Sequence, residues 1–326
     1  MTRTMRTLDG VIEAIRAAKT VAIVCHISPD GDTVGSALAM RLGLMQLGKT
    51  AALYCQDKIP RVLCFLPGAE SFRMPETVED VDLLLCLDVS DEKRMGRCKG
   101  LKRMARHTAL IDHHATNTRF CEVSMVDGTA PANCLIINEL LWRLDCTITP
   151  DVALCLAVGL STDTGNLTYR STTPEAYHVM GDLLETGAPI AAAHRHIYRE
   201  RPPRQLALLA KALESLEFYD DDRITSIRLT HEDFDDCGAL PEDAEIIVNY
   251  GLDIKGVHMC VFAREQADGT TKLSLRSVAP YDITGVAQQF GGGGHAQAAG
   301  ATVPLSLDEA ITRVVESMKQ ELEKTE

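Results

Sequence analysis

The sequence contains no run of about 18 consecutive apolar residues, the length that a membrane-spanning helix requires. It therefore predicts neither a spanning helix nor a membrane partner. Basic residues lie near its start, but no apolar segment follows them as in a secretory signal. No two of its eleven cysteines form a Cys-x-x-Cys pair, which argues against a disulfide framework and a structural zinc site. We expect a cytoplasmic protein.

Positive charge is also scarce. The chain has 33 Lys and Arg residues against 46 Asp and Glu residues, which gives a net charge of −13. A protein that grips long DNA or RNA must neutralise many phosphates with clustered basic residues. We therefore expect no long nucleic acid as a partner. An anionic substrate must be bound at a local site, and metal ions held by carboxylates are the simplest means of attracting it.

The first half of the chain alternates apolar runs with helical patterns. Near-continuous apolar runs, typical of strands buried on both faces, lie at 21–27, 51–55, 81–89 and 108–113. Helical patterns span 34–47, 130–144 and 150–160. This predicts an α/β domain with a mostly parallel sheet flanked by helices, and such sheets carry their active sites at the carboxyl ends of the strands.

The second half has a different pattern. Segments 217–230 and 255–277 have the features of β-hairpins, and 304–324 reads as an amphipathic helix that Ser306 and Glu309 would cap. A glycine run precedes Ala-Gln-Ala-Ala-Gly, for which we predict the start of a helix. The 326 residues are about twice the usual domain length. We expect a domain over 1–190, a linker over 191–215 and a smaller α/β domain over 216–326.

Four motifs place acids and histidines directly after a predicted strand or at the boundary of an element. They are HISPDGD with His26, Asp30 and Asp32; LDVSD with Asp88 and Asp91; IDHHATN with Asp112, His113, His114 and Asn117; and STDTGN with Asp163. The first three motifs follow strands of the predicted sheet, so we expect them to converge at one edge. Each motif alone could be a turn or a helix end, but their joint occurrence favours a site.

These residue types indicate a metal centre. Carboxylates packed together raise one another's pKa unless cations intervene. Asp and His without Cys favour Mn²⁺ or Mg²⁺ over a structural zinc ion. Six ligands with one shared carboxylate describe a two-metal site, which activates water and binds a phosphoryl group.

The four motifs, in this order, resemble those of the DHH phosphoesterase superfamily, and GGGGHAQAAG at 291–300 resembles the signature of its DHHA1 partner domain. The compact build resembles that of the NrnA-type members, bifunctional oligoribonucleases and pAp phosphatases. Its length leaves no room for the additional domains of RecJ-like exonucleases or of the membrane-bound members. The resemblance implies a DHH domain linked to a DHHA1 domain, with the active site in the cleft between them.

The resemblance also implies roles for single residues. One divalent ion would be held by His26, Asp30 and Asp88, and a second by Asp32, Asp88, His113 and Asp163, with Asp88 bridging. Mn²⁺ is favoured, with Mg²⁺ or Co²⁺ as alternatives. The catalytic set would be Asp88, Asp112, which orients its neighbours, and His114, which faces the substrate phosphate.

Substrate binding is expected mainly in the second domain. Successive glycines allow backbone N–H groups to approach a phosphate closely, although a glycine run is as often a flexible turn. The substrate-binding residues implied are Asn117, Arg276, Ser277, Gly292, Gly293, Gly294 and His295. A basic cluster of Arg195, Arg199, Arg201 and Arg204 could guide anions, although a solvated linker face is the simpler explanation.

Together these features predict a metal-dependent phosphoesterase acting on short oligoribonucleotides, including linear dinucleotides, on 3′-phosphoadenosine 5′-phosphate (pAp), or on both. A cyclic-dinucleotide phosphodiesterase and an exopolyphosphatase remain alternatives. A non-catalytic nucleotide-binding module is a third, but it would be expected to lack a ligand, and every motif acid and histidine is present. The sequence leaves the preferred substrate and the cleavage polarity open. A homodimer is common in the family.

Overall fold

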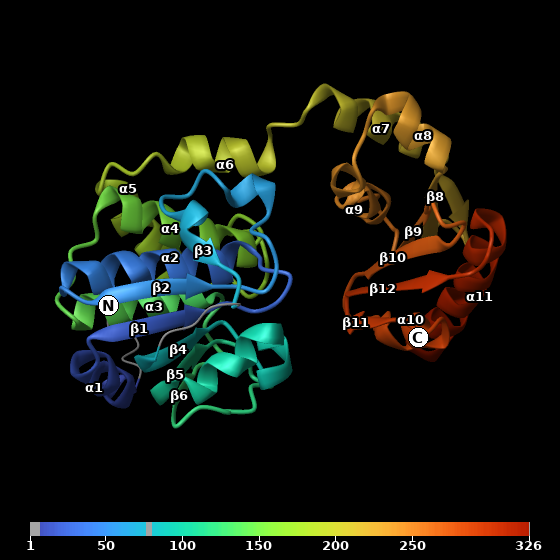
Figure 1. Cartoon of the computed structure of the whole chain (residues 1–326). Helices are drawn as coiled ribbons and strands as arrows, with labels where there is room; N and C mark the ends of the chain where they lie inside the picture. The colour runs from blue at the N-terminus through green and yellow to red at the C-terminus, as the bar shows by residue number, and fades with distance from the viewer. Residues whose placement is uncertain (1–6, 76–79, 326) are drawn as a thin grey trace. The chain divides into compact units, whose positions relative to one another are not determined.

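The computed structural model describes residues 7–75 and 80–325, without the side chains of His295 and Thr325. The chain divides into two compact units, Met1–Glu200 and Arg201–Glu326, each built around a six-stranded sheet (Figure 1). The division lies within the segment 191–215, which consists largely of helices α6 (Ile190–Tyr198) and α7 (Pro203–Glu214). Among the described residues, no helix combines the length and apolar character needed to cross a bilayer.

The sheet of the first unit is parallel throughout, with the strand order β3-β2-β1-β4-β5-β6. Its strands are β1 (Thr20–Val24), β2 (Thr50–Tyr54), β3 (Phe72–Arg73), β4 (Val81–Leu87), β5 (Ala105–Asp112) and β6 (Val123–Val126). The chain builds outward from β1 in one direction and then from β4 in the other. The carboxyl ends of β1 and β4 therefore form a topological switch point, where open α/β sheets bind ligands.

Helices cover both faces of this sheet, which explains the near-continuous apolar strands. On β1, Val21 and Ile23 belong to one core, while Ala22 and Val24 belong to a core on the opposite face. The first core is formed with α1 (Asp9–Ala17), α2 (Gly31–Gln46), α3 (Asn133–Arg143), α4 (Pro150–Asp163) and α5 (Pro174–Glu185). The second is covered by the 3₁₀ segment η3 (Glu92–Arg103). The short 3₁₀ turns η1 (Arg61–Leu63) and η2 (Ala69–Ser71) follow β2.

Helices α2 and α4 approach each other closely beneath the switch point. A Cβ atom at Gly35 would lie 2.4 Å from the carbonyl oxygen of Cys155, and one at Gly159 would lie 3.1 Å from the Cα atom of Asp32. The two glycines therefore allow the start of α2 and the end of α4 to meet. This brings acidic residues from distant parts of the chain to the same place.

The second unit has a mixed sheet in the order β11-β12-β10-β9-β8-β7, in which only the β8–β9 pair is parallel. Its strands are β7 (Glu217–Tyr219), β8 (Ile224–Leu229), β9 (Met259–Glu265), β10 (Thr271–Ser277), β11 (Gly293–His295) and β12 (Ala298–Val303). Helices α10 (Thr284–Gln289) and α11 (Leu307–Thr325) share one core with it. On the other face lie α7, α8 (His231–Cys237), η4 (Pro241–Ala244) and α9 (Ile247–Leu252). The two predicted hairpins are confirmed as β7–β8 and β9–β10.

The predicted helix start after the glycine run is wrong. The residues after His295 belong to a hairpin in which Gly293 pairs with Gly300. Strand β12 also pairs with β10, where Leu273 lies opposite Ala301. The small side chains of this segment suit a close approach of two backbones, and the sheet pairing overrides the helical propensity of its alanines. The run follows the C-terminal end of α10 and does not lie at a helix N-terminus.

Candidate metal centre

The switch point gathers polar residues from four places in the sequence. His26 and Asp88 follow β1 and β4, and His113 follows β5. Asp32 lies in the first turn of α2, and Asp163 ends α4. The backbone of Asp88 has a φ of 60°, a left-handed conformation that costs free energy and is found preferentially at functional sites. Its N–H donates to the carbonyl oxygen of Ile111, 2.9 Å away, which anchors this bend to the neighbouring strand.

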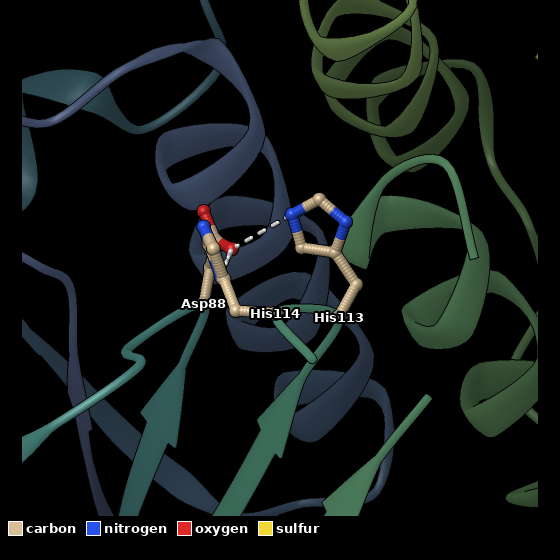
Figure 2. A group of neighbouring side chains, drawn as sticks. All are labelled: Asp88, His113 and His114. Carbon is tan, nitrogen blue, oxygen red and sulfur yellow. Dashed lines mark ion pairs between the residues drawn. The ribbon is translucent and has the colours of Figure 1, made fainter. Parts of the chain in front are cut away.

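Asp88 is the centre of this group. Its side chain is 2% exposed, and Oδ2 lies 3.5 Å from Nε2 of His26. Figure 2 shows its carboxylate facing the imidazoles of His113 and His114, whose nearest ring nitrogens lie 3.4 and 3.5 Å from Oδ1. Oδ1 is buried and accepts no hydrogen bond from any described residue. A buried carboxylate oxygen without a donor, faced by imidazole nitrogens, fits a bound cation.

Two further acids complete the arrangement. Nε2 of His113 lies 3.3 Å from Oδ2 of Asp163 and 3.8 Å from Oδ2 of Asp32. Asp32 is fully buried and accepts hydrogen bonds from the backbone N–H groups of Asn133 and Cys134, at the N-terminus of α3. The positive end of the α3 dipole therefore favours the ionised form of Asp32.

The structure brings all six predicted metal ligands together. Their ligand atoms form overlapping groups, namely His26 with Asp30 and Asp88, Asp32 with His113 and Asp163, and Asp88 with His113 and His114. Four of the six are carboxylates, so with neutral imidazoles the set carries the charge that two divalent cations neutralise. The donor set therefore fits two metal ions.

The crowding of these acids is visible in their pKa values. Burial and the charge of Asp88 raise the pKa of Asp32 to about 7. Burial and the charges of Asp32 and Asp88 raise the pKa of Asp163 well above its usual range. Burial by itself lowers the pKa of His26 and of His113, but contacts with the carboxylates override it and raise both to about 10. These directions all follow from negative charge concentrated in a buried place, which is the charge that bound cations would offset.

Asp112 holds the loop that carries His113 and His114 through its two carboxylate oxygens. Its Oδ1 accepts from the N–H of His113 at 2.9 Å and from Nδ1 of His114 at 2.8 Å. Its Oδ2 accepts from the amide of Asn117, which also donates to the carbonyl oxygen of Val89. In this structure Asn117 braces the loop, and its contact with a substrate stays a prediction.

Sequence reasoning missed Arg94. It is one of several basic residues in the stretch 93–107, and its Nη2 lies 3.1 Å from Nδ1 of His26. Asp91 accepts from the backbone N–H groups of Lys93 and Arg94 and so caps η3, and the carbonyl of Arg94 accepts from the N–H of Ile27. The signal in the sequence that could have revealed this contact is Asp91, the last residue of LDVSD, because the helix that it caps begins beside the site and includes Arg94.

Comparisons with known proteins agree with this geometry. The family model for the DHH family N-terminal domain matches residues 20–160, and the DHHA1 domain model matches residues 232–324. The bifunctional oligoribonuclease and PAP phosphatase NrnA of Thermus thermophilus is 33% identical over 320 residues, which cover 98% of this chain and 94% of that protein. The chain belongs to the DHH family.

Other relatives match nearly the full length of the chain. NrnA of Bacillus subtilis is 24% identical over 310 residues, covering 92% of this chain and 94% of that protein. The crystal structure of an exopolyphosphatase-related protein from Bacteroides fragilis has a TM-score of 0.90 at 27% identity, covering 99% of this chain and 98% of that one. As a member of the DHH family the chain is a hydrolase of phosphoesters.

The DHHA1 domain presents its glycine run at the edge of a sheet. A Cβ atom at Gly292 would lie 2.0 Å from the carbonyl oxygen of Gly300, and Gly294 has a φ of 154°. Gly293 is exposed, and a Cβ atom there would meet nothing within 4 Å. Two of the glycines are thus required by the β11–β12 pairing, while Gly293 leaves open space next to its backbone.

The remaining predicted DHHA1 residues lie nearby in the fold. Arg276 and Ser277 end β10, beside β12. The hydroxyl of Ser277 is buried and donates to the carbonyl oxygen of Tyr281, 2.8 Å away, so it serves the fold of the domain. The side chain of His295 lies outside the described part of the chain. The substrate contacts of all these residues stay predictions.

Proposed function

We propose that the chain is a metal-dependent phosphoesterase that hydrolyses short oligoribonucleotides, including linear dinucleotides, to mononucleotides, and pAp to AMP. The observation that carries this proposal is the convergence of the six ligands on Asp88, whose buried Oδ1 has no hydrogen-bond donor among the described residues. The similarity to NrnA over nearly the full chain supports the substrate class.

We assign one divalent ion to His26, Asp30 and Asp88, and a second to Asp32, Asp88, His113 and Asp163, with Mn²⁺ as the preferred metal. When bound, two such ions would supply the Lewis acidity that polarises a phosphoryl group and lowers the pKa of a water molecule. Asp88 is the residue through which both ions would be held at a fixed separation.

Asp112 and His114 act together beside these ligands. Nδ1 of His114 contacts Asp112 at 2.8 Å, which leaves Nε2 as the free ring nitrogen, and the side chain is 39% exposed. We assign His114 to contact an oxygen of the phosphate under attack and Asp112 to hold the ring in that orientation. This division resembles that in other catalytic sites, where a buried carboxylate fixes the tautomer of a working histidine.

The substrate is short for electrostatic reasons. With a net charge of −13, the chain repels a long polyanion, and binding depends on the metal centre and a few local groups. We assign the backbone of Gly292–Gly294, together with Arg276 and His295, to the nucleotide part of the substrate. We place the protein in the cytoplasm, because its eleven cysteines are all free.

A substrate panel tests the proposal. The purified chain with Mn²⁺ is incubated with di- to pentaribonucleotides, pAp, cyclic dinucleotides and polyphosphate, and the products are separated by chromatography. We expect mononucleotides from the linear oligoribonucleotides and AMP from pAp. Turnover restricted to polyphosphate or to cyclic dinucleotides would replace the proposed substrate class. Binding of these nucleotides without hydrolysis would indicate a non-catalytic module.

A further inference from the structure

The first unit contains a polar pocket outside the metal centre. It has a volume of about 280 Å³ and is lined by Asn166, Ala191, His194, Arg195, Tyr198 and Arg199. We call it the α6 pocket, because five of these residues lie on α6 or directly after it. The sixth, Asn166, lies on the turn that follows α4.

The α6 pocket adjoins the helix end that carries a metal ligand. Asn166 lies three residues after Asp163, and its backbone N–H donates to the carbonyl oxygen of Ser161. The hydroxyl of Tyr198 donates to Oγ of the same Ser161, 3.2 Å away. Burial raises the pKa of Tyr198, and the nearby charge of Asp163 adds to the effect. The pocket and the metal centre therefore share the last turn of α4.

The lining of the pocket is rich in hydrogen-bond donors. Nε of Arg195 donates to Glu200 at 3.2 Å, while its two terminal nitrogens have no partner among the described residues. The guanidinium of Arg199 makes no ion pair with any described residue, and Nε2 of His194 is buried without a hydrogen-bond partner. Arg204, by contrast, is bound to Asp243 of the second unit at 2.7 Å. Arg204 is thus engaged within the second unit, while the guanidinium of Arg199 and the terminal nitrogens of Arg195 could donate to a ligand.

N–H groups that have no acceptor within the protein can donate hydrogen bonds to a bound anion. Guanidinium groups match the geometry of a phosphate, to which they donate in a bidentate manner. A short oligonucleotide with a terminal phosphate, or pAp, carries one phosphate that is cleaved and another one nucleoside away. The metal centre is suited to the first. The α6 pocket adjoins the metal centre and presents the guanidinium of Arg199 and the terminal nitrogens of Arg195.

We propose that the α6 pocket binds a second phosphate of the substrate, one that is not cleaved. This inference rests on the proposed function and extends it, because it makes terminal phosphorylation a determinant of specificity. Contacts with a part of the substrate that does not react supply binding free energy that is used at the reacting centre. Substrates without this phosphate lose that contribution.

The test compares two dinucleotides that differ only in the terminal phosphate, ApA and 5′-phosphorylated pApA. For the wild-type chain with Mn²⁺ we expect kcat/KM to be about tenfold higher for pApA, the size of one charged hydrogen bond. Arg199→Gln and Arg195→Gln should lower this ratio toward one by acting on pApA alone, and Arg199→Lys should retain part of it. Arg106→Gln is the matched control, because Arg106 lies near the start of β5 and pairs with Asp82 there. It should leave the ratio unchanged.

Each other outcome is decisive. Equal losses on ApA and pApA in the Arg199 and Arg195 variants, or no preference in the wild type, would overturn the inference while leaving the proposed function intact. If the wild type hydrolyses neither dinucleotide, the proposed function fails. Calorimetric titration of the manganese-loaded chain with ApA and pApA then tests the binding of the second phosphate by itself. Tighter binding of pApA that Arg199→Gln abolishes would then keep the inference. Equal affinities would overturn it.

Discussion

The switch point of the DHH domain and the glycine run of the DHHA1 domain differ in the atoms that they present, which are side-chain atoms in the first and backbone atoms in the second. At the switch point the working groups are side chains, four carboxylates and two imidazoles around Asp88. At the glycine run side chains are absent, and our proposal assigns the exposed backbone of Gly293 and Gly294 to the nucleotide, while the N–H of Gly292 donates to the carbonyl oxygen of Ala287. We propose that the first arrangement binds metal ions and that the second contacts the nucleotide. Damage to each region should therefore produce a different kinetic defect.

Metal removal should have the largest effect, because it disables the switch point, on which the hydrolysis of every phosphoester depends. Exhaustive treatment with EDTA should lower turnover of every phosphoester by about a thousandfold or more, since the metals supply several kcal/mol of transition-state stabilisation. Mn²⁺ should restore activity better than Ca²⁺, which prefers an all-oxygen ligand set. Full activity in a sample shown by elemental analysis to be free of metal would disprove a metal-dependent reaction.

Two acids of one motif sharpen the account of the switch point. Asp88→Ala removes the shared ligand and should lower kcat/KM by about a thousandfold. Asp91→Ala removes only the cap of η3, so we expect a loss of about 1 kcal/mol in unfolding free energy and little change in activity. Steady-state kinetics and thermal unfolding of the two variants check this. An inactive Asp91→Ala beside an active Asp88→Ala would show that the wrong carboxylate was assigned.

Asp112 separates orientation from metal binding within the same region. Asp112→Asn weakens the contact that holds the ring of His114 but touches no metal ligand atom, so kcat should fall by about 10- to 100-fold with unchanged metal content. Asp32→Asn is the counterpart, and it should lose metal as well as activity. Metal analysis and steady-state kinetics of both variants distinguish a residue that orients His114 from one that binds metal. Loss of metal from Asp112→Asn would place Asp112 among the ligands.

The smallest expected effect is at the glycine run. Gly293→Val places a branched Cβ in open space, so the fold and the metal content should not change. We expect kcat/KM for pApA to fall by at least about tenfold more than for bis(p-nitrophenyl) phosphate, which has no nucleotide part to recognise.

The neighbouring position provides the control for this substitution. Gly292→Ala should destabilise the β11–β12 pairing by about 1 to 3 kcal/mol, because its Cβ would collide with Gly300. Thermal unfolding and kinetics on both esters separate the two variants. Equal losses of Gly293→Val on both substrates would show that this position supports the fold and does not recognise nucleotides.

The same contrast explains what could be predicted from the sequence. The strands β1, β2, β4 and β5 were predicted because burial on both faces makes them continuously apolar. The acids and histidines of the four motifs stood out because they follow such strands or mark element boundaries, and the resemblance to the DHH superfamily selected the six proposed ligands among them. Strands β3 and β6 were missed, since two and four residues are too few to form a pattern.

Features that depend on backbone geometry or on distant packing could not be predicted in this way. The segment after His295 has a helical composition, yet it forms β12 because it pairs with β10 on one side and β11 on the other. Arg94 looks like one of many basic surface residues, and only the turn capped by Asp91 brings it to His26. Neither effect is recorded in residue types alone.

The stoichiometry of bound manganese shows whether two metal ions share Asp88. Equilibrium dialysis of the wild-type chain against Mn²⁺, with bound metal quantified by mass spectrometry, should give two ions per chain. Asp88→Ala should weaken the binding of both. Saturation at one ion in the wild type, or two ions bound with unchanged affinity by Asp88→Ala, would contradict the account.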